Sequence, residues 1–186
     1  LDPAMVNLML QLPSEAQLHE QAETIYVEPI HRAREFARQS IATALENELV
    51  ATYQRLTETQ AYAPQADQIG RRALRNCALG YLMNVDGVGS ELAWQQFNNA
   101  SNMTDKASSL SALVNCEAAQ NYAVQGLKAF EQEYADETLA MNLWLQVQAT
   151  CKLTNGLDRV KALMDHSAFS INNPNKARSL LGAFCS

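Results

Sequence analysis

Residues 29–56 read PIHRAREFARQSIATALENELVATYQRL, and this stretch has no glycine and no proline after its first residue. Pro29 suits the first turn of a helix, because the first backbone N–H groups of a helix have no partner within it. Apolar residues then recur at helical spacing, at Phe36, Ala37, Ile41, Leu45, Leu49, Tyr53 and Leu56. The pattern predicts one amphipathic helix about 40 Å long, at about 1.5 Å per residue.

Residues that cap helix N-termini precede the later apolar stretches. These residues are Asn102 with Asp105, Asp136, Asn155 with Asp158, and Asn173 followed by Pro174. Apolar positions at helical spacing form four stretches in this part of the chain: Ala107, Leu110 and Val114; Ala119, Tyr122, Ala123, Leu127 and Phe130; Leu139, Leu143, Trp144, Val147 and Cys151; and Leu157, Val160 and Leu163. We expect these positions, Trp144 among them, to form a core. The sequence DGVG at 86–89 predicts a turn between helices.

The composition extends this helical pattern to the whole chain. Only 7 Gly and 5 Pro occur in 186 residues, so few positions force a turn. Helix pairs begin near Ala66, Thr104, Thr138 and Asn175, at intervals of roughly 35 to 40 residues that are typical of stacked helix-pair repeats. No consensus residue recurs at every interval. We therefore predict a single all-α domain over residues 1–186, an irregular superhelical array of antiparallel helix pairs like a HEAT or armadillo solenoid.

The charge of the chain bears on its partners. The net charge is -6 and the sequence pI is about 5.0, which disfavours binding to nucleic acid or to an anionic membrane. The basic cluster of Arg71, Arg72 and Arg75 near Asp67 is expected to be a solvated or salt-bridged helix face. No apolar run approaches the roughly 20 residues of a membrane span. We expect no nucleic-acid or membrane partner and a cytoplasmic location.

Catalytic and metal-binding motifs are not found. There is no H-E-x-x-H, no G-x-S-x-G and no close pair of cysteines, and no histidine has another within four residues. The residues concerned are His19, His31 and His166, and Cys77, Cys116, Cys151 and Cys185. We expect the cysteines to be reduced and buried and His31 to cap or pack beside Arg32. We also expect no catalytic residue, no metal and no cofactor in this chain.

Seven segments resemble, in the same order, the C-terminal helical domain of bacterial aminopeptidase N. They are LDPAMVNLMLQLPSE (1–15), PIHRARE (29–35), IATALENELVATY (41–53), RRALRNCALGYL (71–82), QQFNNASNMTDKASSLSAL (95–113), LWLQVQAT (143–150) and HSAFSINNPNKARSLLGAF (166–184). Members of that family add two β domains and a thermolysin-like catalytic domain, which holds zinc through H-E-x-x-H and a distant Glu. The resemblance implies a fragment of the C-terminal domain of a larger zinc aminopeptidase, truncated before the natural C-terminus.

The resemblance also implies a function. In the family that this chain resembles, the helical domain is curved and covers the active-site cleft. The cleft thereby becomes a chamber, and the helical domain restricts the access of peptides to that chamber. This chain would then be a non-catalytic, by itself inactive, part of an enzyme that removes N-terminal residues from peptides. Its partners would be the catalytic domain of the same polypeptide, which carries the zinc, and the peptide substrates. Composition alone leaves open an alternative, an independent helical-repeat scaffold that binds a protein partner.

One polar segment, NNPNKARSL at 172–180, holds the candidate site residues. Asn173 as the cap of a helix opened by Pro174 explains much of it without any substrate. The resemblance places this stretch on the side that faces the chamber. It thereby implies that Asn175 and Arg178 line the chamber and contact the far end of a peptide.

Overall fold

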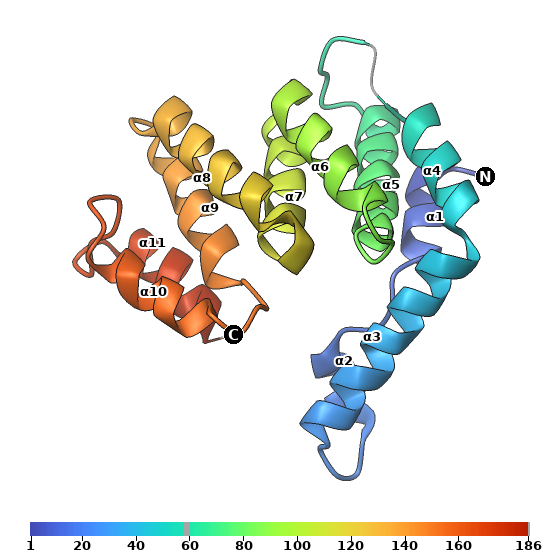
Figure 1. Cartoon of the computed structure of the whole chain (residues 1–186), viewed down its shortest axis with the longest axis horizontal. Helices are drawn as coiled ribbons and strands as arrows, with labels where there is room; N and C mark the ends of the chain where they lie inside the picture. Colours follow the sequence, from blue (N-terminus) through green and yellow to red (C-terminus); the bar gives the residue numbers. More distant parts are fainter. Residues whose placement is uncertain (58–59, 186) are drawn as a thin grey trace. The chain divides into compact units, whose positions relative to one another are not determined.

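The computed structural model describes residues 1–57 and 60–185, and within these ranges it contains eleven α-helices and no strand (Figure 1). The predicted all-helical fold is confirmed. Residue contacts divide the chain into two compact units, Leu1–Gly89 and Ser90–Ser186, and each is described by itself. The assignment of residues 1–186 to a single domain stays a prediction. In the described ranges, no helix is long and apolar enough to span a membrane.

The first unit is built around helix α5. Its helices are α1 (Pro3–Met9), α2 (Glu15–Gln21), α3 (Val27–Ala44), α4 (Glu46–Arg55) and α5 (Ala66–Leu82). Helix α5 packs against α1, α3 and α4, and α2 packs against α3. Helix α1 lies so close to α5 that a Cβ atom on Gly70 would be 3.2 Å from the Cβ of Ala4. The Tyr81 hydroxyl donates a hydrogen bond to the Leu10 carbonyl, which fastens the end of α1.

The single long helix predicted for residues 29–56 is wrong. The chain breaks at Leu45, whose φ of -116° and ψ of 22° are not helical, and α3 and α4 lie on either side. Leu49, Tyr53 and Leu56 are buried as predicted, whereas Phe36 is 73% exposed. Helix α3 packs against both α2 and α5, whereas α4 packs closely on α5, so the break allows α3 to reach α2 while α4 stays along α5. Contacts distant in sequence therefore decide the break.

Residues Arg71, Arg72 and Arg75 were predicted to form a solvated or salt-bridged face, and solvation is wrong for two of them, Arg72 and Arg75. Arg72 and Arg75 are only 5% and 8% exposed. Arg72 donates to Gln68 Oε1 at 3.1 Å and to the Ala63 carbonyl at 3.3 Å. Arg75 donates to the Tyr53 hydroxyl at 3.1 Å and also lies over that ring, 4.7 Å from its centroid. Neutral acceptors and an aromatic ring thus accompany these cations inside the unit.

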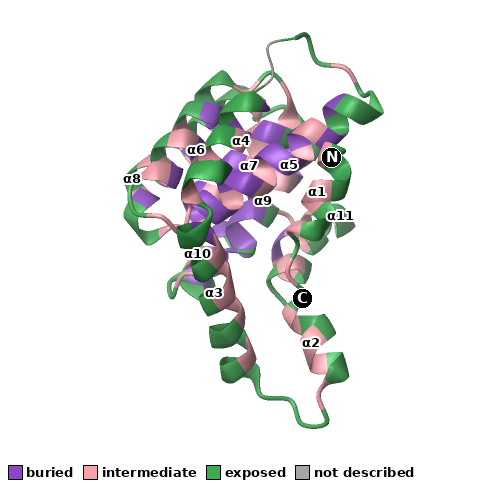
Figure 2. Ribbon diagram, turned by 90° about the vertical axis from the view of Figure 1, so that its right-hand side faces the viewer, coloured by how far each residue is buried: buried purple, intermediate pink, exposed green. Residues whose placement is uncertain are grey.

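The second unit is built around helix α9. It contains most of α6 (Val88–Asn99), then α7 (Met103–Val114), α8 (Gln120–Tyr134), α9 (Thr138–Ala149), α10 (Gly156–Met164) and α11 (Pro174–Ala177). A 3₁₀ turn, η1 (Glu117–Ala119), precedes α8, and a π-helical turn, η2 (Arg178–Gly182), follows α11. Helix α9 packs against α7, α8, α10, α11 and η2, and much of it is coloured as buried in Figure 2. Helices α5, α7, α9 and α11 begin within a residue of the predicted repeat starts.

The predicted helix starts are partly confirmed. The Asn102 side chain accepts from the Asp105 N–H at 2.9 Å and caps α7. Asn155 precedes α10 but makes no capping bond, and α9 begins after Glu137, so the predicted cap at Asp136 is wrong. The predicted turn between helices is confirmed at residues 86–87, and α6 already begins at Val88. Gly87 has φ 78°, a conformation that favours glycine.

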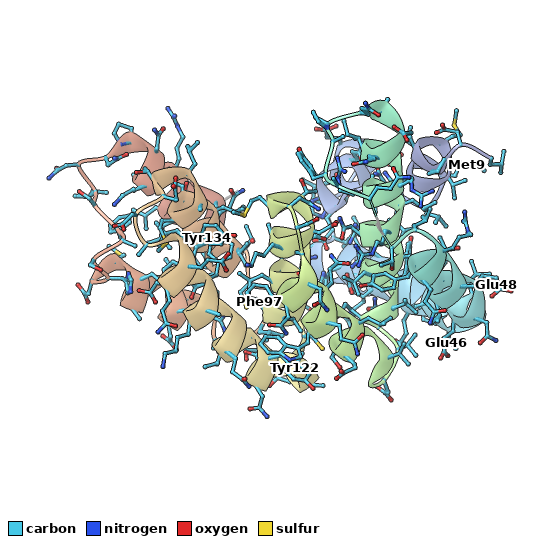
Figure 3. The ribbon with its side chains drawn as sticks, turned by 90° about the horizontal axis from the view of Figure 1, so that it is seen from above. Met9, Glu46, Glu48, Phe97, Tyr122 and Tyr134 are labelled. Atoms are coloured by element: carbon cyan, nitrogen blue, oxygen red, sulfur yellow. The ribbon has the colours of Figure 1, made fainter. Side chains whose placement is uncertain are left out.

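The core of the second unit is aromatic and aliphatic, as predicted. The Trp94 ring stacks on those of Phe97 and Tyr122, with centroids 5.8 and 5.1 Å apart. Phe97 and Tyr122 are labelled in Figure 3. Phe130 and Leu145 are fully buried. Two predicted core positions, Leu139 and Leu157, are instead exposed because the side of the helix that carries each faces away from its neighbours.

The cysteines are free thiols in the described structure. Cys151 is buried and Cys77 and Cys116 are partly buried, but Cys185 is exposed, so the expectation of burial is wrong at that position.

We predict that Trp144→Ala destabilises the chain by about 3–5 kcal/mol, because a large buried side chain leaves a cavity. Trp144 is 4% exposed, and its indole N–H donates to the Leu127 carbonyl at 2.9 Å. Urea denaturation followed by circular dichroism measures the change. The control is Leu139→Ala on the same helix, where the side chain is 82% exposed; an equal loss in both variants would contradict the prediction.

A second prediction concerns Glu133 on α8. Its hydrogen bond from Lys106 on α7, with a smaller contribution from Tyr134, lowers the carboxyl pKa below 4.5 in spite of partial burial. Because the pKa of Glu133 is lower in the folded chain than in the unfolded chain, the ionised carboxylate stabilises the fold at pH values above the unfolded-state pKa. This stabilisation is lost as the pH falls through the folded-state pKa. Glu133→Gln should therefore cost at most about 0.2–1 kcal/mol near neutral pH, since the carboxylate is half exposed.

The test is urea denaturation of the Glu133→Gln variant and the parent chain at several pH values. The difference between the two should vanish in strong acid, where the parent carboxyl is protonated as well. A difference that persists unchanged there would show that the Lys106–Glu133 ion pair is not its source.

Candidate functional site

The segment that holds Asn175 and Arg178 forms a short helix with a strong N-terminal cap. The Asn173 side-chain oxygen accepts from the backbone N–H groups of Asn175 and Lys176, at 3.0 and 3.3 Å, and Pro174 occupies the first turn. The predicted cap at Asn173 is confirmed. These bonds fix the backbone on which the two candidate side chains are carried.

A π-helical turn continues this helix and carries Arg178 as its first residue. Leu180, on the same turn, is fully buried, and the turn packs against α9 and α10. Single π-helical turns are uncommon and occur often at functional sites. Asn175 and Arg178 are three residues apart, so both side chains lie on one side of the helical turn.

Both candidate side chains are exposed. Within residues 1–57 and 60–185, neither side chain takes part in a hydrogen bond or an ion pair. The guanidinium of Arg178 therefore keeps all its donors available to a ligand, and the amide of Asn175 keeps both its donor and its acceptor. The backbone that carries Asn175 and Arg178 is held in place by the Asn173 cap and the buried Leu180. The side chains of Asn175 and Arg178 are not needed for this.

A polar cavity of about 160 Å³ borders the same segment through Lys176. His166, Glu131, Thr138 and Ser167 contribute polar groups to its lining. His166 Nδ1 accepts from the Ala168 N–H at 3.1 Å, so the proton of the neutral ring lies on Nε2, which is 3.1 Å from Glu131 Oε1. Both ring nitrogens of His166 therefore have a partner within the chain. Neither nitrogen is free to accept a proton from a ligand in the cavity.

The described residues show no pairing typical of nucleophilic catalysis. No serine hydroxyl or cysteine thiol in them makes a hydrogen bond to a histidine. Burial raises the pKa of the Cys77 thiol, although Arg38 opposes this effect, so the reactive thiolate is disfavoured. The exposed polar side chains of Asn175 and Arg178 suit the binding of polar groups.

One cluster was missed by the sequence reasoning. In the first unit, Glu15, His31 and Glu35 place potential ligand atoms within 4.8 Å of one another, the only such group of three or more in the described chain. His31 contacts Glu15, with Nδ1 2.9 Å from Oε1, a partner that the sequence did not indicate. The spacing of His31 and Glu35, one helical turn apart, was visible in the sequence. The approach of Glu15 from α2 was not.

Comparison with known proteins gives a consistent result. The family described as "Domain of unknown function (DUF3458_C) ARM repeats" matches residues 1–186. Aminopeptidase N of Haemophilus influenzae is 36% identical over 98% of the chain, and aminopeptidase N of Escherichia coli is 33% identical over 99% of it. The chain covers 21% of each of these relatives.

A solved structure agrees with the sequence comparisons. The crystal structure of Legionella pneumophila aminopeptidase A in complex with aspartic acid matches with a TM-score of 0.87 and 30% identity. The match covers 99% of this chain and 22% of that one. The predicted helix-pair array therefore corresponds to ARM repeats.

Proposed function

Because this chain belongs to the DUF3458_C family of ARM-repeat domains and corresponds to the C-terminal region of aminopeptidase N homologues, we propose that it is the non-catalytic part of an aminopeptidase that controls peptide access. One observation carries the proposal. Nearly the whole of this chain aligns with aminopeptidase N relatives, and the aligned part is only about a fifth of each relative. The catalytic domain is absent from this chain.

The residues present indicate which tasks this chain and the rest of the polypeptide would have. Zinc peptidase chemistry needs clustered ligands such as H-E-x-x-H, and the sequence of 186 residues contains no such motif. Catalytic zinc and the general base would be supplied by another part of the same polypeptide. The helices of this chain would provide a stable wall, because each repeat is held by burial against its neighbours.

Asn175 and Arg178 are the residues through which the wall would contact substrate. Both are exposed on a backbone fixed by the Asn173 cap and the buried Leu180. The forked donors of Arg178 suit a peptide carboxylate or carbonyl, and the amide of Asn175 can bind a peptide group on both sides. In this proposal they contact the peptide far from the bond that is cut.

The isolated chain should not hydrolyse aminoacyl arylamides above the rate in buffer, because it lacks a catalytic constellation. The measurement is release of the arylamine with excess chain. Hydrolysis that increases in proportion to chain concentration and survives repurification would overturn the non-catalytic assignment.

In the full-length polypeptide, Arg178→Ala should raise KM for longer peptides by roughly tenfold and leave kcat nearly unchanged. A contact held equally in the ground and transition states affects binding only, and a charge-assisted hydrogen bond is worth about 1.5–3 kcal/mol. Kinetics on short arylamides should stay normal, since such substrates do not reach Arg178.

Two control variants separate binding from stability. Arg178→Lys keeps the charge but not the fork, so it should recover part of the binding. Lys161→Ala removes an exposed cation on α10 and should change nothing. If Arg178→Ala instead lowers Tm and leaves the dependence on peptide length unchanged, Arg178 is a structural residue.

A further inference from the structure

We propose that Glu15, His31 and Glu35 form a binding site for a divalent transition-metal ion, with zinc the expected occupant. Their potential ligand atoms lie within 4.8 Å of one another. This inference is independent of the proposed function, because it rests only on two helices of the first unit. It replaces the expectation of no metal, which considered the spacing between histidines and not one histidine with two carboxylates.

The three side chains are carried by elements whose positions are fixed. His31 and Glu35 lie one turn apart on α3, so they share one face of that helix. Glu15 is the first residue of α2, where a capping box between Ser14 and Gln17 holds the helix start, with bonds of 3.1 and 2.8 Å. The two helices pack against each other.

A bond between the helices also sets their separation. Arg34 Nε on α3 donates to the Pro13 carbonyl at 2.8 Å, just before α2. The three ligands are therefore held by helices that are already joined, so little ordering is needed when a metal binds.

One carboxylate oxygen of the cluster, Glu35 Oε1, has no hydrogen-bond partner among the described residues in the metal-free form. Two carboxylates face one imidazole, and His31 Nδ1 is 2.9 Å from Glu15 Oε1. Glu35 Oε1 is also shielded from solvent. Its nearest cation, Arg34 Nη1, is 3.7 Å away, beyond hydrogen-bond length. A bound divalent ion would compensate both carboxylates and occupy the unused lone pair of Glu35.

The donor set selects the class of metal. One imidazole with two carboxylates suits zinc and its neighbours in the first transition row, whereas calcium and magnesium prefer oxygen ligands alone. Ligand atoms around a tetrahedral zinc lie about 3.4 Å apart, because each bond is about 2.1 Å long. The cluster can reach that geometry through small side-chain movements, with the metal replacing the proton on Nδ1.

The exposure of the ligands determines what else can bind. The side chains of His31, Glu15 and Glu35 are 47%, 33% and 38% exposed. Three protein ligands leave at least one coordination position open to water in a site reached by solvent. The ion would also join α2 to α3 across the intervening residues 22–26, and such a link should resist separation of the two helices.

The test uses the full 186-residue chain with Cys185→Ser, which removes the one exposed thiol, after treatment with a chelator. Titration with Co²⁺ should give one equivalent of bound metal with visible d–d bands and no thiolate charge-transfer band. Zinc should displace the cobalt and raise Tm. His31→Ala should abolish binding, and Glu35→Gln should weaken it by about tenfold or more, because each removes one of three ligands.

Glu35→Gln is the decisive variant because it leaves the His31–Glu15 pair untouched, and circular dichroism checks that it is folded. The matched control is His166→Ala, which removes the other histidine–glutamate pair, between His166 and Glu131, and should leave one equivalent bound. The absence of saturable binding with millimolar Co²⁺ or Zn²⁺ overturns the proposal. Unchanged affinity in folded Glu35→Gln also overturns it and reduces the cluster to an ion pair between helices.

Discussion

Burial of helix α9 on several sides is the constraint on which the second unit depends. Helices α7, α8, α10 and α11 all pack against it, and Leu145 and Trp144 are buried within that packing. A helix that is apolar on most of its surface is stable only when others cover it, so the positions of its neighbours follow from its burial. The π-helical turn that carries Arg178 is positioned in the same way, through Leu180.

Helix α5 has the corresponding role in the first unit, but it buries charge as well as apolar surface. Arg72 and Arg75 are enclosed together with Gln68, the Ala63 carbonyl and the Tyr53 ring. An enclosed guanidinium without partners would be very costly, so these acceptors are required wherever α5 is covered. The same packing brings α1 close at Gly70, where no side chain would fit without displacement.

The groups suited to binding lie outside these two buried helices, and His31 and Glu35 among them are carried by α3. Asn175 and Arg178 are exposed on α11 and the turn after it, and Glu15 begins the short helix α2. This arrangement separates stability from recognition: buried contacts fix the backbone, and exposed polar side chains keep their donors, acceptors and lone pairs for a ligand.

Local features were predictable from the sequence because neighbouring residues decide them. The helical composition, the caps at Asn102 and Asn173 and the glycine turn at 86–87 depend on backbone groups a few residues away. The break at Leu45, the burial of Arg72 and Arg75 and the approach of Glu15 to His31 were decided by tertiary structure alone. Each depends on residues distant in sequence, and helical periodicity shows which side of a helix is apolar without showing what will cover it.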